Sequence, residues 1–156
     1  MKWYVLRFVS SRFTPVINFL SLSQINWFCP MRRNDFIRPD AQLSIRRRLT
    51  PAFPGYLFVQ LDFEKVHPEK LAAFQHIYGL VKFCDEPIPV PPKIMDTILK
   101  WNWASDIVPP LRGKKSIPHG FAEILGMEDP LKRSLALLNY LTDVYSRSQK
   151  EAEYGT

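Results

Sequence analysis

The sequence predicts an α+β fold in which strands and helices follow one another along the chain. Alternating side chains indicate strands near residues 3–9 and 56–62, each with two dissimilar faces. Apolar residues at helical spacing follow helix-start signals at Thr14 and Pro68. In a chain of 156 residues, 46% apolar and 13% aromatic side chains are enough to bury a core, which excludes wholesale disorder.

Up to about Trp101, strand, helix and turn signals divide the chain into short elements. Pro30 closes one strand, and Phe53-Pro54-Gly55 has the composition of a turn. In order, we expect a strand at residues 3–9, a helix from Thr14 to near Asn26, a short strand at 27–29, a long hairpin or loop at 31–52, a strand at 56–62, a helix from Pro68 to before Gly79, a strand at 80–84 and a helix from Ile94 to about Trp101.

Residues 31–52 are rich in arginine, and we expect them to stand off the body of the fold. A net charge of +6 and a pI near 9.4 favour a polyanionic partner, nucleic acid before membrane. Arg46 to Arg48 either attract nucleic acid through long-range charge or form a solvated loop tip. The arginines of this segment are Arg32, Arg33, Arg38, Arg46, Arg47 and Arg48.

Residues 104–119 have the composition of a linker, with prolines, a glycine and cations of one sign. Residues 120–156 follow with apolar side chains at helical spacing and a start signal at Asp129-Pro130, which predicts a helical hairpin. Ser134 to Leu141 also fits a strand, and that alternative stays open. The apolar residues are Phe121, Ile124, Leu125, Leu131, Leu135, Leu138 and Leu141.

The sequence favours a cytoplasmic protein without membrane attachment, and a monomer. Cys29 and Cys84 lie far apart beside aromatic or apolar neighbours, which favours reduced thiols over a disulfide. The apolar N-terminus is interrupted by Arg7 and lacks a cleavage site, which is typical of a strand and not of a signal peptide. No apolar run reaches the length of a transmembrane helix.

Side chains with catalytic or metal-binding chemistry are sparse. None of His67, His76 and His119 has a second ligand at metal spacing, and Cys-x-x-Cys and glycine-rich phosphate motifs are absent. Asp62 and Glu64, at i and i+2 on a strand end, fit either a magnesium nuclease or, preferably, a solvated strand end. We therefore expect no metal, no cofactor and no enzymatic activity.

The strand at 56–62 has an aliphatic face and an aromatic face. Leu57, Val59 and Leu61 form the first, which suits a core covered by helices. Tyr56, Phe58 and Gln60 form the second. Two interpretations stay open: the aromatic face is exposed and binds a partner, or helices on both sides of the sheet bury it as ordinary core.

Several short motifs occur in a recognisable order: Trp3-Tyr4-Val5-Leu6, Pro30-Met31-Arg32-Arg33, Phe53-Pro54-Gly55-Tyr56-Leu57-Phe58-Val59, the strand Gly79 to Phe83, and Pro89-Val90-Pro91. Together they resemble the N-terminal domain of the NusG and RfaH family of bacterial transcription elongation factors, over about residues 2–100. The resemblance implies a domain at residues 1–103 with a four-stranded antiparallel sheet and flanking helices.

Two further motifs are similar to the C-terminal domain of the specialised RfaH subgroup: Phe121-Ala122-Glu123-Ile124-Leu125 and Arg133-Ser134-Leu135-Ala136-Leu137-Leu138-Asn139. After the linker at 104–119, residues 120–156 are then expected to form a helical hairpin rather than the KOW-like β-barrel of NusG. The segment from Gly113 to Gly120 is shorter than the first barrel arm of these relatives, and Pro118 removes a ladder donor. Both departures argue against the barrel, and against a ribosomal partner recruited by it.

The resemblance implies a non-enzymatic factor that binds RNA polymerase and the non-template DNA strand and suppresses pausing and termination at specific operons. For the clamp helices of the β′ subunit it implies Phe53, Pro54, Tyr56 and Phe58. For the β-subunit side it implies His67, Pro68, Glu69 and Lys70. The DNA-binding candidates are Ser10, Ser11, Arg12, Arg38, Gln75 and His76, and the apolar residues of 120–156 named above would form an autoinhibitory interface.

Two alternatives belong beside this hypothesis. One is a stand-alone nucleic-acid-binding module with no polymerase role, which the basic charge alone would also support. The other is a general factor of the NusG kind that acts at all genes. The helical stripe after Asp129 and the short segment before Gly120 favour the specialised kind.

Overall fold

A four-stranded antiparallel sheet forms the centre of the protein, in the order β2-β5-β1-β6. The computed structural model describes residues 1–37, 45–103, 117, 118 and 120–154. The central pair, β1 (Lys2–Phe8) and β5 (Tyr56–Leu61), runs from Lys2 opposite Leu61 to Arg7 opposite Tyr56. The edge strands are β2 (Asn26–Phe28) and β6 (Ile77–Leu80). The predicted fold class, with a four-stranded antiparallel sheet and helices, is confirmed.

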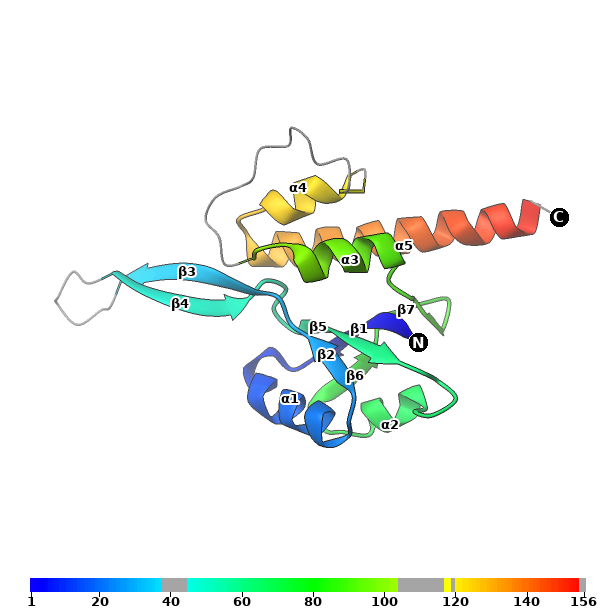
Figure 1. Cartoon of the computed structure of the whole chain (residues 1–156), viewed down its shortest axis with the longest axis horizontal. Helices are drawn as coiled ribbons and strands as arrows, with labels where there is room; N and C mark the ends of the chain where they lie inside the picture. The colour runs from blue at the N-terminus through cyan, green and yellow to red at the C-terminus, as the bar shows by residue number, and fades with distance from the viewer. Residues whose placement is uncertain (38–44, 104–116, 119, 155–156) are drawn as a thin grey trace.

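Helices cover both faces of this sheet (Figure 1). On one face, α1 (Phe13–Leu22) and α2 (Pro68–Ala72) pack with the aliphatic side of β5. On the other, α3 (Pro92–Lys100), α4 (Phe121–Gly126) and α5 (Pro130–Tyr154) pack with its aromatic side. The strand period of two explains the division, because Leu57 and Val59 enter one cluster and Phe58 enters the other.

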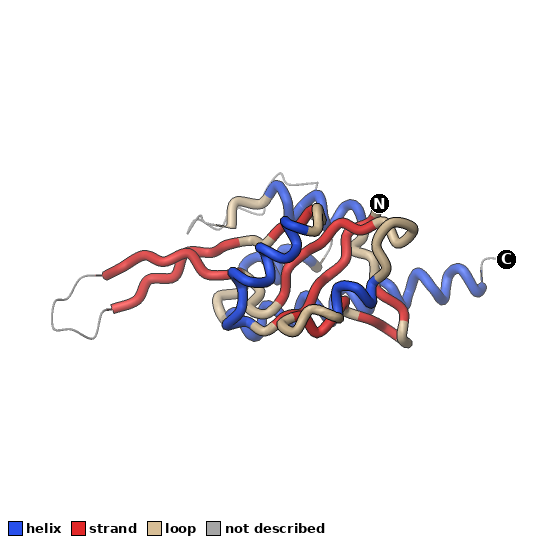
Figure 2. The backbone as a smooth tube through the Cα atoms, turned by 90° about the horizontal axis from the view of Figure 1, so that it is seen from below, coloured by secondary structure: helices blue, strands red, loops and turns tan. Residues whose placement is uncertain are grey.

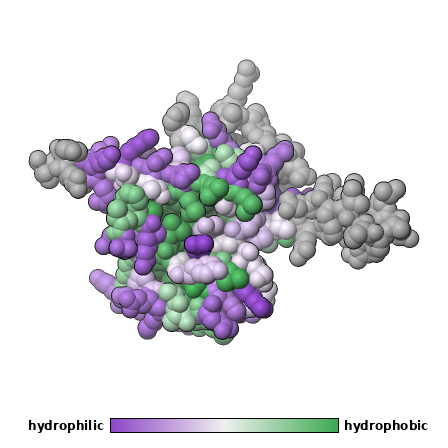
Figure 3. Space-filling view, turned by 180° about the vertical axis from the view of Figure 1, so that it is seen from behind, coloured by the Kyte–Doolittle hydropathy of each residue, from purple (hydrophilic) through white to green (hydrophobic). Residues whose placement is uncertain are grey.

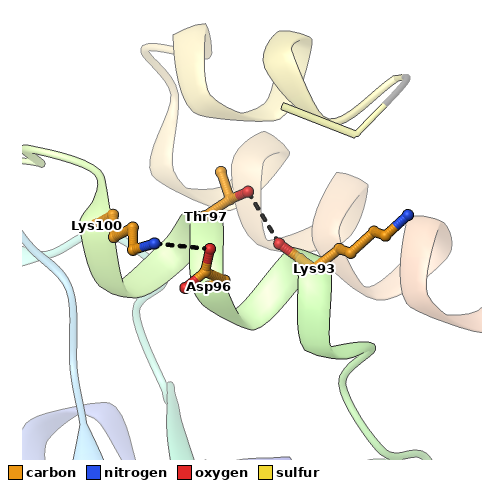
Figure 4. Close-up of polar contacts among 4 residues, drawn as sticks. All are labelled: Lys93, Asp96, Thr97 and Lys100. Carbon is orange, nitrogen blue, oxygen red and sulfur yellow. Dashed lines mark hydrogen bonds and ion pairs between the residues drawn. The ribbon is translucent and has the colours of Figure 1, made fainter. Parts of the chain in front are cut away.

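The helix α3 shows how one short element serves both core and surface. Its buried residues Ile94, Met95 and Ile98 join the apolar cluster under α4 and α5. Its outer side carries local polar contacts: Lys100 Nζ lies 3.1 Å from Asp96 Oδ2, and Thr97 Oγ1 donates to the carbonyl of Lys93 at 3.0 Å (Figure 4). Such exposed i,i+4 pairs add only a few tenths of a kcal/mol, so burial holds the helix in place.

The first helix begins and ends differently from the prediction. A 3-10 turn, η1 (Ser10–Arg12), precedes α1, so the α-helix begins at Phe13 and not after a Thr14 cap. It ends at Leu22, short of the expected Asn26, because Gln24 adopts a positive φ of 58°. A left-handed residue stops an α-helix, and non-glycine residues in that region are hard to predict from sequence.

The basic segment forms a two-stranded antiparallel hairpin, β3 (Met31–Ile37) and β4 (Ile45–Pro51). Figure 2 shows it projecting from the body of the molecule, as expected for a hairpin standing off the core. Seen from behind, hydrophobic surface gathers across the middle of the molecule, with hydrophilic surface above and below it (Figure 3). The predicted candidate Arg38 lies outside the described residues.

The predicted strand at 80–84 is two separate elements. β6 ends at Leu80, and β7 (Lys82–Phe83) turns back through Cys84 and Asp85 to pair with β8 (Glu86–Pro87). Both turn residues have positive φ, 52° and 64°. Continuous apolar composition predicted one strand because the turn uses two non-glycine residues in left-handed conformations.

The C-terminal residues form two helices in the structure, and the alternative strand at Ser134 to Leu141 is not observed. The helix α5 spans 25 residues and includes this whole stretch. Most of the predicted linker, residues 104–116 and 119, lies outside the described part of the chain. Within the described residues, no helix combines the length and apolar character needed to span a membrane.

The two cysteines are expected to differ sharply in reactivity. Cys29 is buried, and burial raises the pKa of its thiol to about 12, whereas Cys84 is exposed. A disulfide-exchange reagent at pH 8 should therefore modify Cys84 quickly and Cys29 only after unfolding in guanidinium, because the thiolate is the reactive form. The Cys84→Ser variant isolates Cys29, and fast labelling of that variant in native buffer would contradict the packing of β2 against the core.

Candidate interaction surfaces

The turn before β5 places an aromatic group on one face of the sheet. Phe53 and Phe58 are fully buried with their rings edge to face at 6.2 Å, and Tyr56 is half-buried beside them. The turn needs glycine at position 55, where φ is +83° and a Cβ would lie 3.4 Å from the carbonyl oxygen of Phe8. The backbone N–H of Phe8 donates to the Gly55 carbonyl at 2.9 Å, which ties this turn to β1.

The C-terminal helices cover this aromatic group. Phe53, Phe58 and Trp103 belong to one buried cluster with side chains of α4 and α5. Of the two interpretations open at the sequence level, the structure therefore has helices on both sides of the sheet. The buried residues that α4 and α5 contribute are Phe121, Ile124, Leu125, Leu137 and Leu141, and Leu138 packs against them partly buried.

Leu131 and Leu135 do not lie on this covering face, in contrast to the prediction. Their exposed fractions are 69% and 62%. The face of α5 that turns inward carries Arg133 and Leu137 instead. The prediction assumed that the leucines of α5 form its buried face. In the structure, Arg133 lies on the buried face, and Leu131 and Leu135 are exposed.

Arg133 is held by backbone carbonyls from two parts of the chain. Only 2% exposed, it donates to the carbonyl of Ala52 just before the Phe53 turn. Its Nε and Nη2 atoms donate to the Met127 carbonyl at 3.0 and 2.8 Å, and Nη2 also reaches the Glu128 carbonyl at 3.1 Å. These bonds join the loop between α4 and α5 to the turn before β5.

Arg32, at the base of the projecting hairpin, donates to the same loop. Its Nη1 atom lies 2.9 Å from the Met127 carbonyl oxygen and 3.5 Å from that of Leu125. The pKa of Arg133 is lowered to about 10, mainly by burial and then by the positive charge of Arg32, while Asp129 opposes the shift. Arg133 is therefore still charged at neutral pH, and two guanidinium groups share one carbonyl oxygen.

Neither the buried position of Arg133 nor the Arg32 contact is predicted by the sequence analysis. Arginine counts as a surface residue in hydrophobic patterns, and both contacts join positions far apart in the chain. One local signal existed: Asp129 caps α5, its Oδ1 accepting from the N–H of Leu131 at 2.9 Å, which sets where the helix starts.

The residues expected to face the β subunit lie at the start of α2. His67 is the N-cap, its Nδ1 atom accepting from the N–H of Glu69 at 3.2 Å, and Pro68 occupies the first turn. His67, Glu69 and Lys70 are exposed. The helix cap explains His67 and Pro68 locally and leaves the charged side chains of Glu69 and Lys70 accessible.

Two of the predicted DNA-binding segments lie side by side. The N–H of Val9, just before η1, donates to the carbonyl of His76 at 2.9 Å. Ser10, Ser11 and Arg12 are exposed, and the Gln75 amide lies 3.2 Å from the His76 ring nitrogen. Two segments far apart in the sequence thus form one polar surface at the end of β1.

Of the two carboxylates considered for a nuclease, that of Asp62 has a structural role. Asp62 Oδ1 accepts from the N–H of Glu64 at 3.0 Å, which is the geometry of a turn after β5, and Glu64 is exposed. In the described part of the chain, no three His, Cys, Asp or Glu side chains are grouped so as to hold a metal ion.

Comparison with known proteins gives two findings. A family model described as "Transcription termination factor nusG" matches residues 1–99. A solved structure titled "Domain interaction in Thermotoga maritima NusG" is similar to the chain at 20% sequence identity and a TM-score of 0.44. That similarity covers 68% of this chain, and the chain spans 59% of the Thermotoga maritima protein.

Replacing Arg133 by methionine is expected to loosen the C-terminal helices, because the carbonyls of Ala52, Met127 and Glu128 lose a charged donor. The free energy of opening should fall by about 2–3 kcal/mol. Hydrogen–deuterium exchange of the amides around Leu137 should rise accordingly. Lys132→Met removes the same charge from the adjacent, exposed position, and equal exchange in both variants would show that these bonds do not hold the helices.

Proposed function

The chain belongs to the NusG family of non-enzymatic transcription factors, which bind RNA polymerase, and we propose that it is a specialised, autoinhibited member. In this proposal it suppresses pausing and termination at specific operons while bound to the polymerase and to the non-template strand. The observation that carries the proposal is the aromatic group of Phe53 and Phe58, buried beneath α4 and α5.

The aromatic group is the proposed docking site for the β′ clamp helices. Phe53, Pro54, Tyr56 and Phe58 lie in or next to one turn, a compact set of the kind that dominates interface energies. With α4 and α5 in place, Phe53 and Phe58 have no exposed surface to offer. Docking therefore requires the C-terminal helices to leave, and the buried side chains of α4 and α5 form the autoinhibitory interface.

The charged start of α2 is the proposed contact to the β-subunit side. Glu69 and Lys70 are exposed there, beyond the His67 cap. A factor that touches both sides of the polymerase cleft favours the closed clamp and opposes the paused state. The effect is a shift in population and needs no chemical step.

The polar surface formed by η1 and Gln75-His76 is the proposed site for the non-template strand. It combines a cation at Arg12 with hydroxyl and amide groups, which contact phosphates and the edges of unstacked bases. Arg38, which lies outside the described residues, is a further candidate for the same contact. A stand-alone nucleic-acid-binding module would use the same surface, but it gives no reason for a covered aromatic group.

Opening the C-terminal cover is expected to increase polymerase binding. Leu137→Glu places a charge in the buried cluster, whereas Leu135→Glu, on the exposed side of α5, leaves the cluster intact. In co-purification with core RNA polymerase, Leu137→Glu should bind about tenfold better or more than the unaltered chain, a difference of at least ~1.4 kcal/mol. Leu135→Glu should behave like the unaltered chain.

Adding Tyr56→Ala to Leu137→Glu tests the docking site itself, since Tyr56 is only half-buried and its loss spares the core. The double variant is expected to lose the gain. No binding to polymerase by any of these proteins would refute the proposal and leave the nucleic-acid-binding module.

Removing the cation of η1 should weaken DNA binding in a salt-dependent way. For single-stranded DNA, the slope of log K against log salt is negative. Arg12→Gln is expected to reduce its magnitude by about 0.7, because one phosphate contact is lost. Fluorescence anisotropy at several salt concentrations measures this slope. Lys2→Gln, at the opposite end of β1, is the charge-matched control, and an equal change in both variants would exclude a specific contact at Arg12.

A further inference from the structure

A β-bulge at the sheet edge presents Tyr78 to solvent. Arg7 of β1 pairs with Gly79, but the next residue, Phe8, pairs with Ile77, so Tyr78 is the extra residue on β6. Its side chain is 62% exposed, unusually open for a large ring. Bulges re-aim side chains and are frequent beside functional sites.

Two cationic side chains, Arg7 and Lys82, lie near this ring. The guanidinium carbon of Arg7 lies 5.0 Å from the ring centroid of Tyr78, which is a cation–π arrangement. Lys82 is exposed and lines the same hollow as Arg7 and Tyr78. Among the described residues, neither cation belongs to an ion pair, and no acidic side chain lines this hollow.

The hollow measures about 280 Å³ and is bounded by Arg7, Tyr56, Tyr78, Lys82 and, from α5, Leu138. Arg7, Tyr78 and Lys82 belong to β1, β6 and β7, so they stay in place when α5 leaves. Small-molecule sites run from ~300 to 1,000 Å³, so this one suits a single planar group and little more. Gly79, next to Tyr78, has a φ of +128°, which disfavours any residue with a side chain at this position.

We propose that this hollow is a nucleotide subsite, in which one base of a single-stranded nucleic acid stacks on the Tyr78–Arg7 pair and its phosphate contacts Lys82. Aromatic rings and guanidinium planes both stack with bases, and a paired cation binds the backbone. An acidic peptide would satisfy Lys82 and Arg7 but would make no use of the exposed ring.

The subsite continues the polar surface already described. Val9 and His76, joined by their backbone hydrogen bond, stand between η1 and the bulge, so Arg7 and Tyr78 are the next exposed positions along β1 and β6. In this proposal, a strand that contacts Arg12 and Gln75 continues along the edge of the sheet to Tyr78. The inference rests on the proposed DNA contact and adds a stacking position to it.

The test measures binding of the full-length chain to a fluorescein-labelled oligothymidine by anisotropy. Tyr78→Ser is expected to weaken binding about 5- to 100-fold without changing the salt slope, since stacking is lost and no phosphate contact is. Tyr78→Phe should restore affinity. Lys82→Gln should lower the salt slope by about 0.7, and the exposed Lys93→Gln control should not.

Unchanged affinity of Tyr78→Ser would overturn the subsite. Two competitors identify the ligand. If free thymidine monophosphate or oligoglutamate displaces the oligothymidine as effectively as unlabelled oligothymidine does, the assignment to a strand is overturned.

Co-purification of Tyr78→Ser with RNA polymerase separates the two proposals. Retained polymerase binding with unchanged oligothymidine affinity removes the subsite alone, whereas absence of polymerase binding in every protein, with a stacking defect in Tyr78→Ser, removes the polymerase role alone.

Discussion

Both faces of β5 are apolar, and each needs its own cover. The aliphatic face is covered by α1 and α2, which lie in the segments on either side of β5 in the sequence. The aromatic face receives α3 and, from the far end of the chain, α4 and α5. A buried aromatic face that depends on a distant segment is the constraint that shapes the molecule, because removing the cover exposes a large apolar surface.

The covered aromatic face has a consequence for the proposed binding of a partner: the apparent affinity depends on the fraction of molecules in which α4 and α5 have left. Under the proposed function, a partner for the aromatic face would bind only molecules in which α4 and α5 have left, so its apparent affinity would be its intrinsic affinity multiplied by the open fraction. If closure were favoured by about 3 kcal/mol, roughly one molecule in a hundred would be open, and binding would weaken about a hundredfold. The cover would then keep the aromatic group from unspecific association until a trigger arrives.

The sequence predicts the parts of the fold that depend on local period. Alternation assigned Leu57 and Phe58 to opposite faces, and both lie where they were expected. Hydrophobic spacing predicted the helix α5 correctly but placed Leu131 and Leu135 on its buried face. A pattern based on leucines does not anticipate that Arg133 is buried there instead. The bulge at Tyr78 was also missed, because register shifts depend on pairing between distant strands. The residues of the candidate site on β5 could therefore be predicted from the sequence. Which side chains of α5 cover that site could not.

The acceptors that hold Arg133 and Arg32 are main-chain oxygens, which has an evolutionary consequence. Every residue carries a carbonyl, so substitutions at Ala52, Met127 or Glu128 leave the acceptor in place as long as the backbone keeps its course. The donors have no such redundancy. We therefore expect substitutions at these three acceptor positions to be tolerated better than substitutions of the two arginines.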